Sequence, residues 1–102
     1  MPQSESFVSS VLDVVESIPP GHVMAYGDIA AAIGSRAPRA VGQVMAKYGS
    51  TVPWWRVVRA SGQPPLCHDE QALTHYREEG TPIVATTSGG YRINLRIARY
   101  RP

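Results

Sequence analysis

Cysteine is almost absent from this chain of 102 residues, with Cys67 as its single thiol. One thiol excludes an internal disulfide and a zinc site built from several cysteines, so we expect a reducing, cytoplasmic location. The chain also lacks any run of about 18 apolar residues, which excludes a membrane-spanning helix. Its first residues are acidic and do not form a basic-then-apolar leader, so no secretory signal is expected.

Acidic residues are missing from two long stretches, although the formal net charge is only +2. Residues 29–68 hold five basic residues and no acid, and residues 81–102 hold four arginines and no acid. Such segregation favours a polyanionic partner. A solvated surface with uneven charge stays open as the plainer explanation. For the C-terminal arginines, the alternatives are contacts with the backbone of such a polyanion and a solvated tail.

Apolar spacing in the first half predicts three helices. Ser4 can cap a helix that reaches Ile18 and stops at the prolines that follow. A short extended segment over residues 22–26 leads to a helix at about 27–33, and Pro38 is well placed to begin a third helix ending near Tyr48. Two short helices joined by a tight turn are typical of a helix-turn-helix.

The second half predicts short β elements around one more helix. The branched and aromatic residues 52–59 predict a strand, and Asp69 can cap a helix that reaches Glu79. Residues 82–87 and 91–95 predict a hairpin or wing. We therefore expect one domain over residues 1–102, mainly α, with a helix-turn-helix or winged-helix-like arrangement and a minor β component.

The most specific pattern is the segment 53–58, Pro-Trp-Trp-Arg-Val-Val. It resembles the Pro-Cys-His-Arg-Val motif of the O6-alkylguanine-DNA alkyltransferases, with Trp54 in the place of the alkyl-acceptor Cys and Trp55 in the place of the His. Residues 23–30 resemble that family's entry to its helix-turn-helix, and residues 39–43 its recognition helix. Residues 91–95 look like the tail of the alkyltransferase-like proteins, the branch with Trp at the acceptor position. The resemblance spans the chain in the expected order and implies the fold of the family's C-terminal domain.

Alkyl transfer at position 54 is excluded by chemistry, because an indole is a hydrogen-bond donor with no nucleophilic lone pair. The resemblance therefore implies a protein that is not an enzyme and needs no cofactor. It would bind O6-alkylguanine in double-stranded DNA by nucleotide flipping, shield the lesion and hand it to nucleotide excision repair proteins. A monomer is expected, associated with the nucleoid if the source is bacterial. Acidic stretches such as Glu78-Glu79 are candidate contacts for the repair proteins.

The resemblance also assigns roles to single residues. Arg39 matches the arginine that fills the gap left by a flipped nucleotide, and Tyr26 matches the tyrosine that presses on the 3′ phosphate. Arg56 matches the motif's arginine, which supports the pocket loop more than it contacts DNA. The expected DNA-binding residues are Tyr26, Arg39, Ala40, Gly42 and Gln43. The expected lesion pocket is formed by Tyr26, Pro53, Trp54, Arg56, Val57 and Val58.

This sequence departs from the alkyltransferases in the length and composition of its loops. The stretch from Arg39 to Pro53 is about two residues shorter and lacks the family's hinge asparagine. Residues 63–67 lack its glycine-rich lid, which predicts a more open pocket that tolerates bulky alkyl groups. The dipeptide Cys67-His68 is interpreted as incidental. His22 and His75 have no partner at ligand spacing, so no metal is expected.

Two other functions stay open at this stage. A helix-turn-helix regulator would use Arg39 and Gln43 to recognise an unmodified sequence, normally as a dimer on two half-sites. A base-removing glycosylase on the same scaffold would need a carboxylate or lysine at the pocket. Residues 29–68 contain no acid, which disfavours the glycosylase.

Overall fold

A computed structural model describes residues 5–102. Its first helix, α1 (Glu5–Ser17), buries Val11 and Val15, as the apolar spacing predicts. The predicted cap at Ser4 lies outside the described residues. The Ile18 amide donates to the Val15 carbonyl at 3.2 Å and closes the last turn of the helix. The two prolines that follow prevent the helix from continuing.

The predicted helix-turn-helix consists of α2 (Tyr26–Ala32) and α3 (Pro38–Tyr48). The strand β1 (Met24–Ala25) leads into α2, and the Asp28 carboxylate accepts a 3.0 Å hydrogen bond from the Ala25 amide at the start of that helix. Gly34 turns the chain with φ +73°, a conformation that favours glycine. Helix α2 begins one residue earlier than the sequence predicts. Pro38 occupies the first turn of α3 as expected.

The strand expected over residues 52–59 is mostly wrong. Only β2 (Val57–Val58) is extended, and it follows two 3₁₀ turns, η1 (Gly49–Thr51) and η2 (Trp54–Arg56). Pro53 cannot donate to a strand ladder, and its carbonyl instead closes η2 by accepting from the Arg56 amide at 3.1 Å. The two tryptophans therefore lie on a tight turn. Strand β2 pairs in parallel with β1, which places this turn beside the start of α2.

The C-terminal part contains the expected helix and hairpin. Helix α4 (Asp69–Glu79) begins after His68, which takes the capping position expected for Asp69. The Asp69 carboxylate still lies in the first turn, where it complements the helix dipole. Strands β3 (Ile83–Ala85) and β4 (Tyr91–Ile93) pair antiparallel. A short helix that the sequence did not predict, α5 (Leu95–Ala98), follows them and leads to a parallel bridge between Val23 and Arg99.

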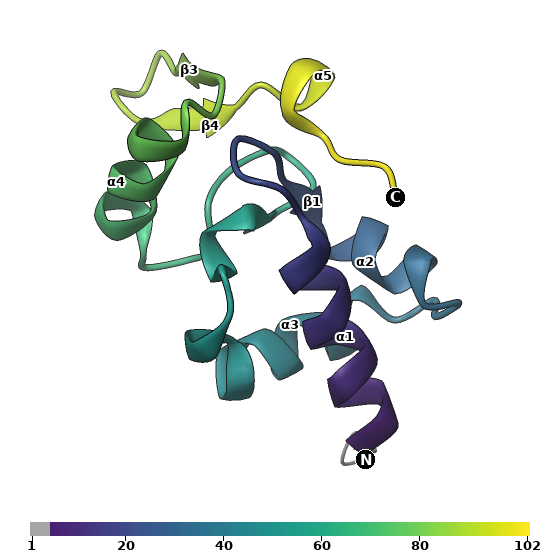
Figure 1. The fold of residues 1–102 in the computed structure, drawn as a ribbon. Coiled ribbons are helices and arrows are strands. Elements are labelled where there is room, and N and C mark those ends of the chain that lie inside the picture. Colours follow the sequence, from purple (N-terminus) through teal and green to yellow (C-terminus); the bar gives the residue numbers. More distant parts are fainter. Residues whose placement is uncertain (1–4) are drawn as a thin grey trace.

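The core consists of two clusters of buried side chains on either side of the β1–β2 pair. The first joins α1, α2 and α3 through residues such as Val15, Ile29 and Val44. The second joins α4, β4 and α5 around Tyr76, Ile93 and Ala98. Figure 1 shows α4 and the hairpin on one side of the molecule and α1 to α3 on the other. The predicted mainly helical class with short β elements is confirmed. No helix among residues 5–102 is long and apolar enough to cross a membrane.

Candidate nucleic-acid interface

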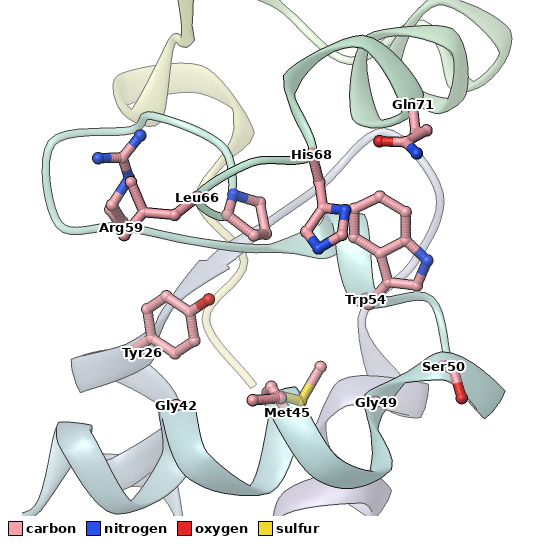
Figure 2. Close-up of a pocket in the computed structure, with 12 residues that line it drawn as sticks. Tyr26, Gly42, Met45, Gly49, Ser50, Trp54, Arg59, Leu66, His68 and Gln71 are labelled. Carbon is pink, nitrogen blue, oxygen red and sulfur yellow. The ribbon is translucent and has the colours of Figure 1, made fainter.

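A cavity of about 690 Å³ lies between α3 and the segment that runs from residue 59 into α4. Figure 2 shows α3 along one side and the 59–71 segment along the other, with Tyr26 near one end and Trp54 near the opposite end. The lining combines three aromatic rings with small and flexible apolar side chains, and it contains no carboxylate. The lining residues are Tyr26, Gly42, Met45, Ala46, Gly49, Ser50, Trp54, Arg59, Pro65, Leu66, His68 and Gln71.

Tyr26 and Arg59 lie at the same end of the cavity. The Tyr26 ring is half-buried at the start of α2, and this burial raises the pKa of its hydroxyl, while the Arg59 charge acts in the opposite direction. The hydroxyl therefore remains protonated at neutral pH and can donate a hydrogen bond. Arg59 is held in place because its Nε donates to the Pro64 carbonyl at 3.0 Å. This end of the cavity thus offers hydrogen-bond donors to an anion or a base edge.

Trp54 is surrounded by aromatic rings at the other end. Its ring centroid lies 5.4 Å from that of His68, 5.8 Å from that of His75 and 5.7 Å from that of Trp55. The contacts with His75 and Trp55 are edge-to-face, a favourable arrangement for aromatic pairs. These neighbours fix the indole as a flat apolar surface at the cavity end.

Trp55 does not line the cavity and belongs to the structural support behind it. Its ring stacks on His75 at 3.6 Å with an interplanar angle of 5°, and its Nε1 donates to the Glu79 carboxylate at 3.1 Å. The Tyr76 hydroxyl donates to the Trp55 carbonyl at 2.6 Å. Side chains from α4 therefore hold both the ring and the backbone of η2.

Arg56 forms a nearly buried ion pair with Glu79. Its Nη2 lies 2.6 Å from one carboxylate oxygen, its Nε donates to the other at 3.1 Å, and its Nη1 donates to the Ile18 carbonyl at 2.9 Å. Burial alone would raise the pKa of Glu79, but the hydrogen bonds from Arg56 and Trp55 outweigh it and hold the pKa below its ordinary value. The pair connects the end of α1, the turn η2 and the end of α4.

The structure places most of the predicted pocket wall away from this cavity. Pro53, Arg56, Val57 and Val58 do not line the cavity. Val57 and Val58 have no exposed surface, since each belongs to one of the two core clusters, and Arg56 is turned toward Glu79. Of residues 53–58, only Trp54 lines this cavity, because the 3₁₀ turn η2 places Trp55 and Arg56 against α4 and the core takes up Val57 and Val58.

The predicted DNA-binding residues lie on or beside α3. Arg39 and Gln43 are exposed, Ala40 is half-buried, and Gly42 lines the cavity together with Tyr26. A methyl group added at Gly42 would sit 4.0 Å from the Tyr26 ring, an ordinary contact, so the glycine keeps the cavity floor open without relieving a clash. Helix α3 therefore carries the exposed Arg39 and Gln43 and also supplies part of the cavity lining.

Sequence reasoning missed more than half of the cavity lining. Gly42, Met45, Ala46 and Gly49 follow helical spacing along α3, so the position of Gly42 could have indicated the other three. No sequence signal indicated Arg59, Pro65, Leu66, His68 or Gln71, because an irregular loop and the first turn of α4 bring them over α3. His68 in particular contacts Trp54, although the dipeptide Cys67-His68 was interpreted as incidental. Among residues 5–102 no group of three or more histidine, cysteine or acidic side chains is placed to hold a metal.

Known proteins resemble this chain in both sequence and structure. Residues 6–79 match the family described as 6-O-methylguanine DNA methyltransferase, DNA binding domain. The DNA base-flipping protein of Escherichia coli is 40% identical over 109 aligned positions, which cover 99% of this chain and 78% of that protein. Alkyltransferase-like protein 1 of Schizosaccharomyces pombe is 32% identical, over 96% of this chain and 97% of that protein.

Solved structures extend this similarity to the fold. The S. pombe protein Atl1, in complex with damaged DNA containing O6-carboxymethylguanine, superposes with a TM-score of 0.85 at 31% identity over 99% of this chain and all of that one. A variant of the Mycobacterium tuberculosis protein OGT superposes with a TM-score of 0.65 at 27% identity, over 84% of this chain and 55% of that one. The chain therefore belongs to the family of the 6-O-methylguanine DNA methyltransferase DNA-binding domain, as an alkyltransferase-like member of it.

Proposed function

We propose that this protein is a non-catalytic sensor that binds O6-alkylguanine in double-stranded DNA and releases it unchanged. The observation that carries the proposal is the cavity beside α3, closed at one end by the indole of Trp54. Relatives named as base-flipping and alkyltransferase-like proteins, one of them solved on damaged DNA, support it. The proposal includes the substitution itself, with Trp54 at the acceptor Cys position and Trp55 at the His position of the motif.

Three residues would divide the work of flipping the nucleotide. Arg39, exposed on α3, would enter the duplex and stack in the gap, for which a planar guanidinium is suited. The protonated Tyr26 hydroxyl would donate to the phosphate beside the flipped nucleotide. Trp54 would meet the O6 substituent at the end of the cavity. A base with weakened pairing costs less to extrude, so the damaged base would be favoured over guanine.

The cavity also supports tolerance of large adducts. Its volume of about 690 Å³ falls in the range of pockets that bind drug-sized ligands. Leu66 at its edge is 68% exposed and Met45 is flexible, so both can adapt to different substituents. We expect affinity to hold or rise from methyl to benzyl adducts.

Binding without repair requires a second step, which we propose is a handoff to nucleotide excision repair proteins. Of the two acidic candidates, Glu78 and Glu79, only Glu78 is available for contact, because the Glu79 side chain is 13% exposed and occupied by Arg56. Charge reversal at the exposed Glu78 should weaken repair coupling and leave DNA affinity unchanged. Unaltered coupling would remove this surface from the proposal.

The decisive experiment compares duplexes that are identical except at O6 of one guanine, which is unmodified, methylated or benzylated. The modified duplexes should bind more tightly, and Arg39→Ala should weaken binding of all three. Arg36→Ala, which removes another exposed arginine just before α3, is the matched control and should have a smaller effect. Equal affinities for the three duplexes would instead favour a helix-turn-helix regulator that reads sequence through Arg39 and Gln43.

A further inference from the structure

The arginines near the C-terminus are not used by the cavity. Arg96, Arg99 and Arg101, together with Leu95, surround a hollow of about 300 Å³, which we call the C-terminal arginine groove. The surrounding stretch, residues 81–102, contains no acid. A concave cluster of arginines is a favourable site for phosphate groups, because guanidinium binds phosphate through paired hydrogen bonds.

The groove lies beside the first turn of α2, the helix that begins with Tyr26. Arg99 Nε lies 3.2 Å from the Asp28 carboxylate in the first turn of α2, two residues after Tyr26. The Tyr100 amide donates to the Val23 carbonyl at 2.8 Å, which holds the C-terminal segment beside the entry to the same helix. Figure 1 shows α5 and the C-terminus on the side of the molecule where β1 leads into α2.

The groove also packs against the loop that follows Arg59. The Ile93 amide donates to the Gly62 carbonyl at 2.8 Å, and a methyl group added at Gly62 would sit 3.5 Å from Leu95 Cγ. Arg59 itself lines the cavity beside Tyr26. The loop after Arg59 therefore joins this end of the cavity to the segment that leads into the groove.

Most of the charge in the groove is not neutralised within the protein. Arg99 pairs with Asp28, but Arg96 and Arg101 are exposed and have no ion-pair partner among residues 5–102. DNA carries a regular line of phosphates next to any flipped nucleotide, and neutralising them releases counterions. The polymer that fits both the charge and the position is the backbone of the strand that leaves the cavity past Tyr26.

We propose that the C-terminal arginine groove binds DNA phosphates and extends the backbone contacts beyond the helix-turn-helix. The proposal rests on the orientation of DNA in the proposed function, and it adds a second, sequence-independent contact surface. Arg96 and Arg101 supply the free charges, while the ion pair of Arg99 with Asp28 holds the segment against α2.

The test measures how DNA affinity depends on salt for the double variant Arg96→Gln/Arg101→Gln. The slope of log K against log[salt] should become shallower by about 0.9 for each phosphate that the protein no longer neutralises, or about 1.8 in total. Unmodified and O6-methylated duplexes should weaken by the same factor, so the ratio of their affinities should not change. Arg77→Gln/Arg92→Gln removes the same charge from exposed positions outside the groove and should leave the slope nearly unchanged.

A second measurement locates the contact on the DNA. Duplexes shortened on one side of the lesion should bind the wild type less tightly, and the loss should be much smaller for the groove variant. The proposal would be overturned if the groove variant and its control showed the same salt slope and the same dependence on duplex length. The arginines would then be assigned to the binding of a protein partner. Equal affinity of the wild type for modified and unmodified duplexes would contradict the sensor function, while the salt comparison would still decide the role of the groove.

Discussion

At the scale of single residues, the neighbouring Trp54 and Trp55 have different roles. Trp54 faces the cavity, and Trp55 stacks on His75 and donates to Glu79 behind it. Adjacent residues of a strand, the element expected over residues 52–59, would also point to opposite sides. The 3₁₀ turn achieves the same separation.

Under the proposed assignment of Trp54 and Trp55 to the Cys and His positions of the motif, a thiol introduced at position 54 should not give repair. Trp54→Cys should show no transfer of the alkyl group from an O6-methylated duplex, because that assignment leaves no histidine at the motif position to generate the thiolate. Incubation with a radiolabelled methyl duplex, followed by denaturing gel electrophoresis, detects any transfer to protein. Trp54→Ser is the matched control for a small side chain without a thiol.

Recovered transfer would contradict this expectation, and the structure indicates where the base would come from. The rings of His68 and His75 flank the Trp54 indole at 5.4 and 5.8 Å. Adding His68→Ala or His75→Ala to the cysteine variant would then identify which histidine had taken the role.

At the scale of elements, the ion pair of Arg56 and Glu79 joins three segments that are far apart in the sequence. It connects η2 to the end of α4, to the carbonyl of Ile18 after α1 and, through a 3.4 Å hydrogen bond, to the Gly21 amide. The family's arginine is expected to support the pocket loop, and this geometry provides a physical means for it to do so. Breaking one partner of a nearly buried pair leaves the other charge poorly solvated.

We therefore expect Glu79→Gln to lower the free energy of unfolding by about 2 kcal/mol, less than for a fully buried pair, because both side chains keep some contact with solvent. Because the native pKa of Glu79 is lowered, its contribution to stability is complete above the ordinary pKa of 4.5 and disappears as pH falls through the native value. Urea unfolding at neutral and acid pH should show wild type and variant converging at low pH. Glu78→Gln, the exposed neighbour, is the control, and an equal loss in both variants would contradict a special role for the pair.

Local sequence predicted most of the helices and failed where distant segments meet. The spacing in α1, the position of Pro38 and the turn glycines indicate local structure, and these elements lie within a residue or two of their predicted bounds. The parallel pairing of β1 with β2 joins distant residues such as Met24 and Val57, and no local pattern encodes it. The cavity lining from residues 59–71 was missed for the same reason, since a loop acquires its position from what it packs against.

At the scale of the whole molecule, the cavity lies where the two halves of the chain meet. Its lining comes from α2 and α3 on one side and from the 59–71 segment and α4 on the other. A base held there would contact both halves at once. Binding to the native state alone stabilises it by mass action, by about 2.7 kcal/mol when the free ligand is about a hundredfold above its Kd.

An O6-methylated duplex should therefore stabilise the protein more than an unmodified duplex at the same concentration. Urea unfolding followed by tryptophan fluorescence measures this without heating the DNA. Arg39→Ala should reduce the difference between the two duplexes. Identical shifts for both duplexes in the wild type would mean that the cavity does not distinguish them.

The lone thiol gains a practical use from its place in the fold. Cys67 is exposed and sits between Leu66 and His68, two residues that line the cavity, in a backbone conformation with φ +68°. As the single cysteine of the chain, it would accept a thiol-reactive fluorophore at one known position without any mutation. Native protein labelled there would carry an optical reporter at the rim of the cavity, and its emission would follow entry and exit of a nucleotide in real time.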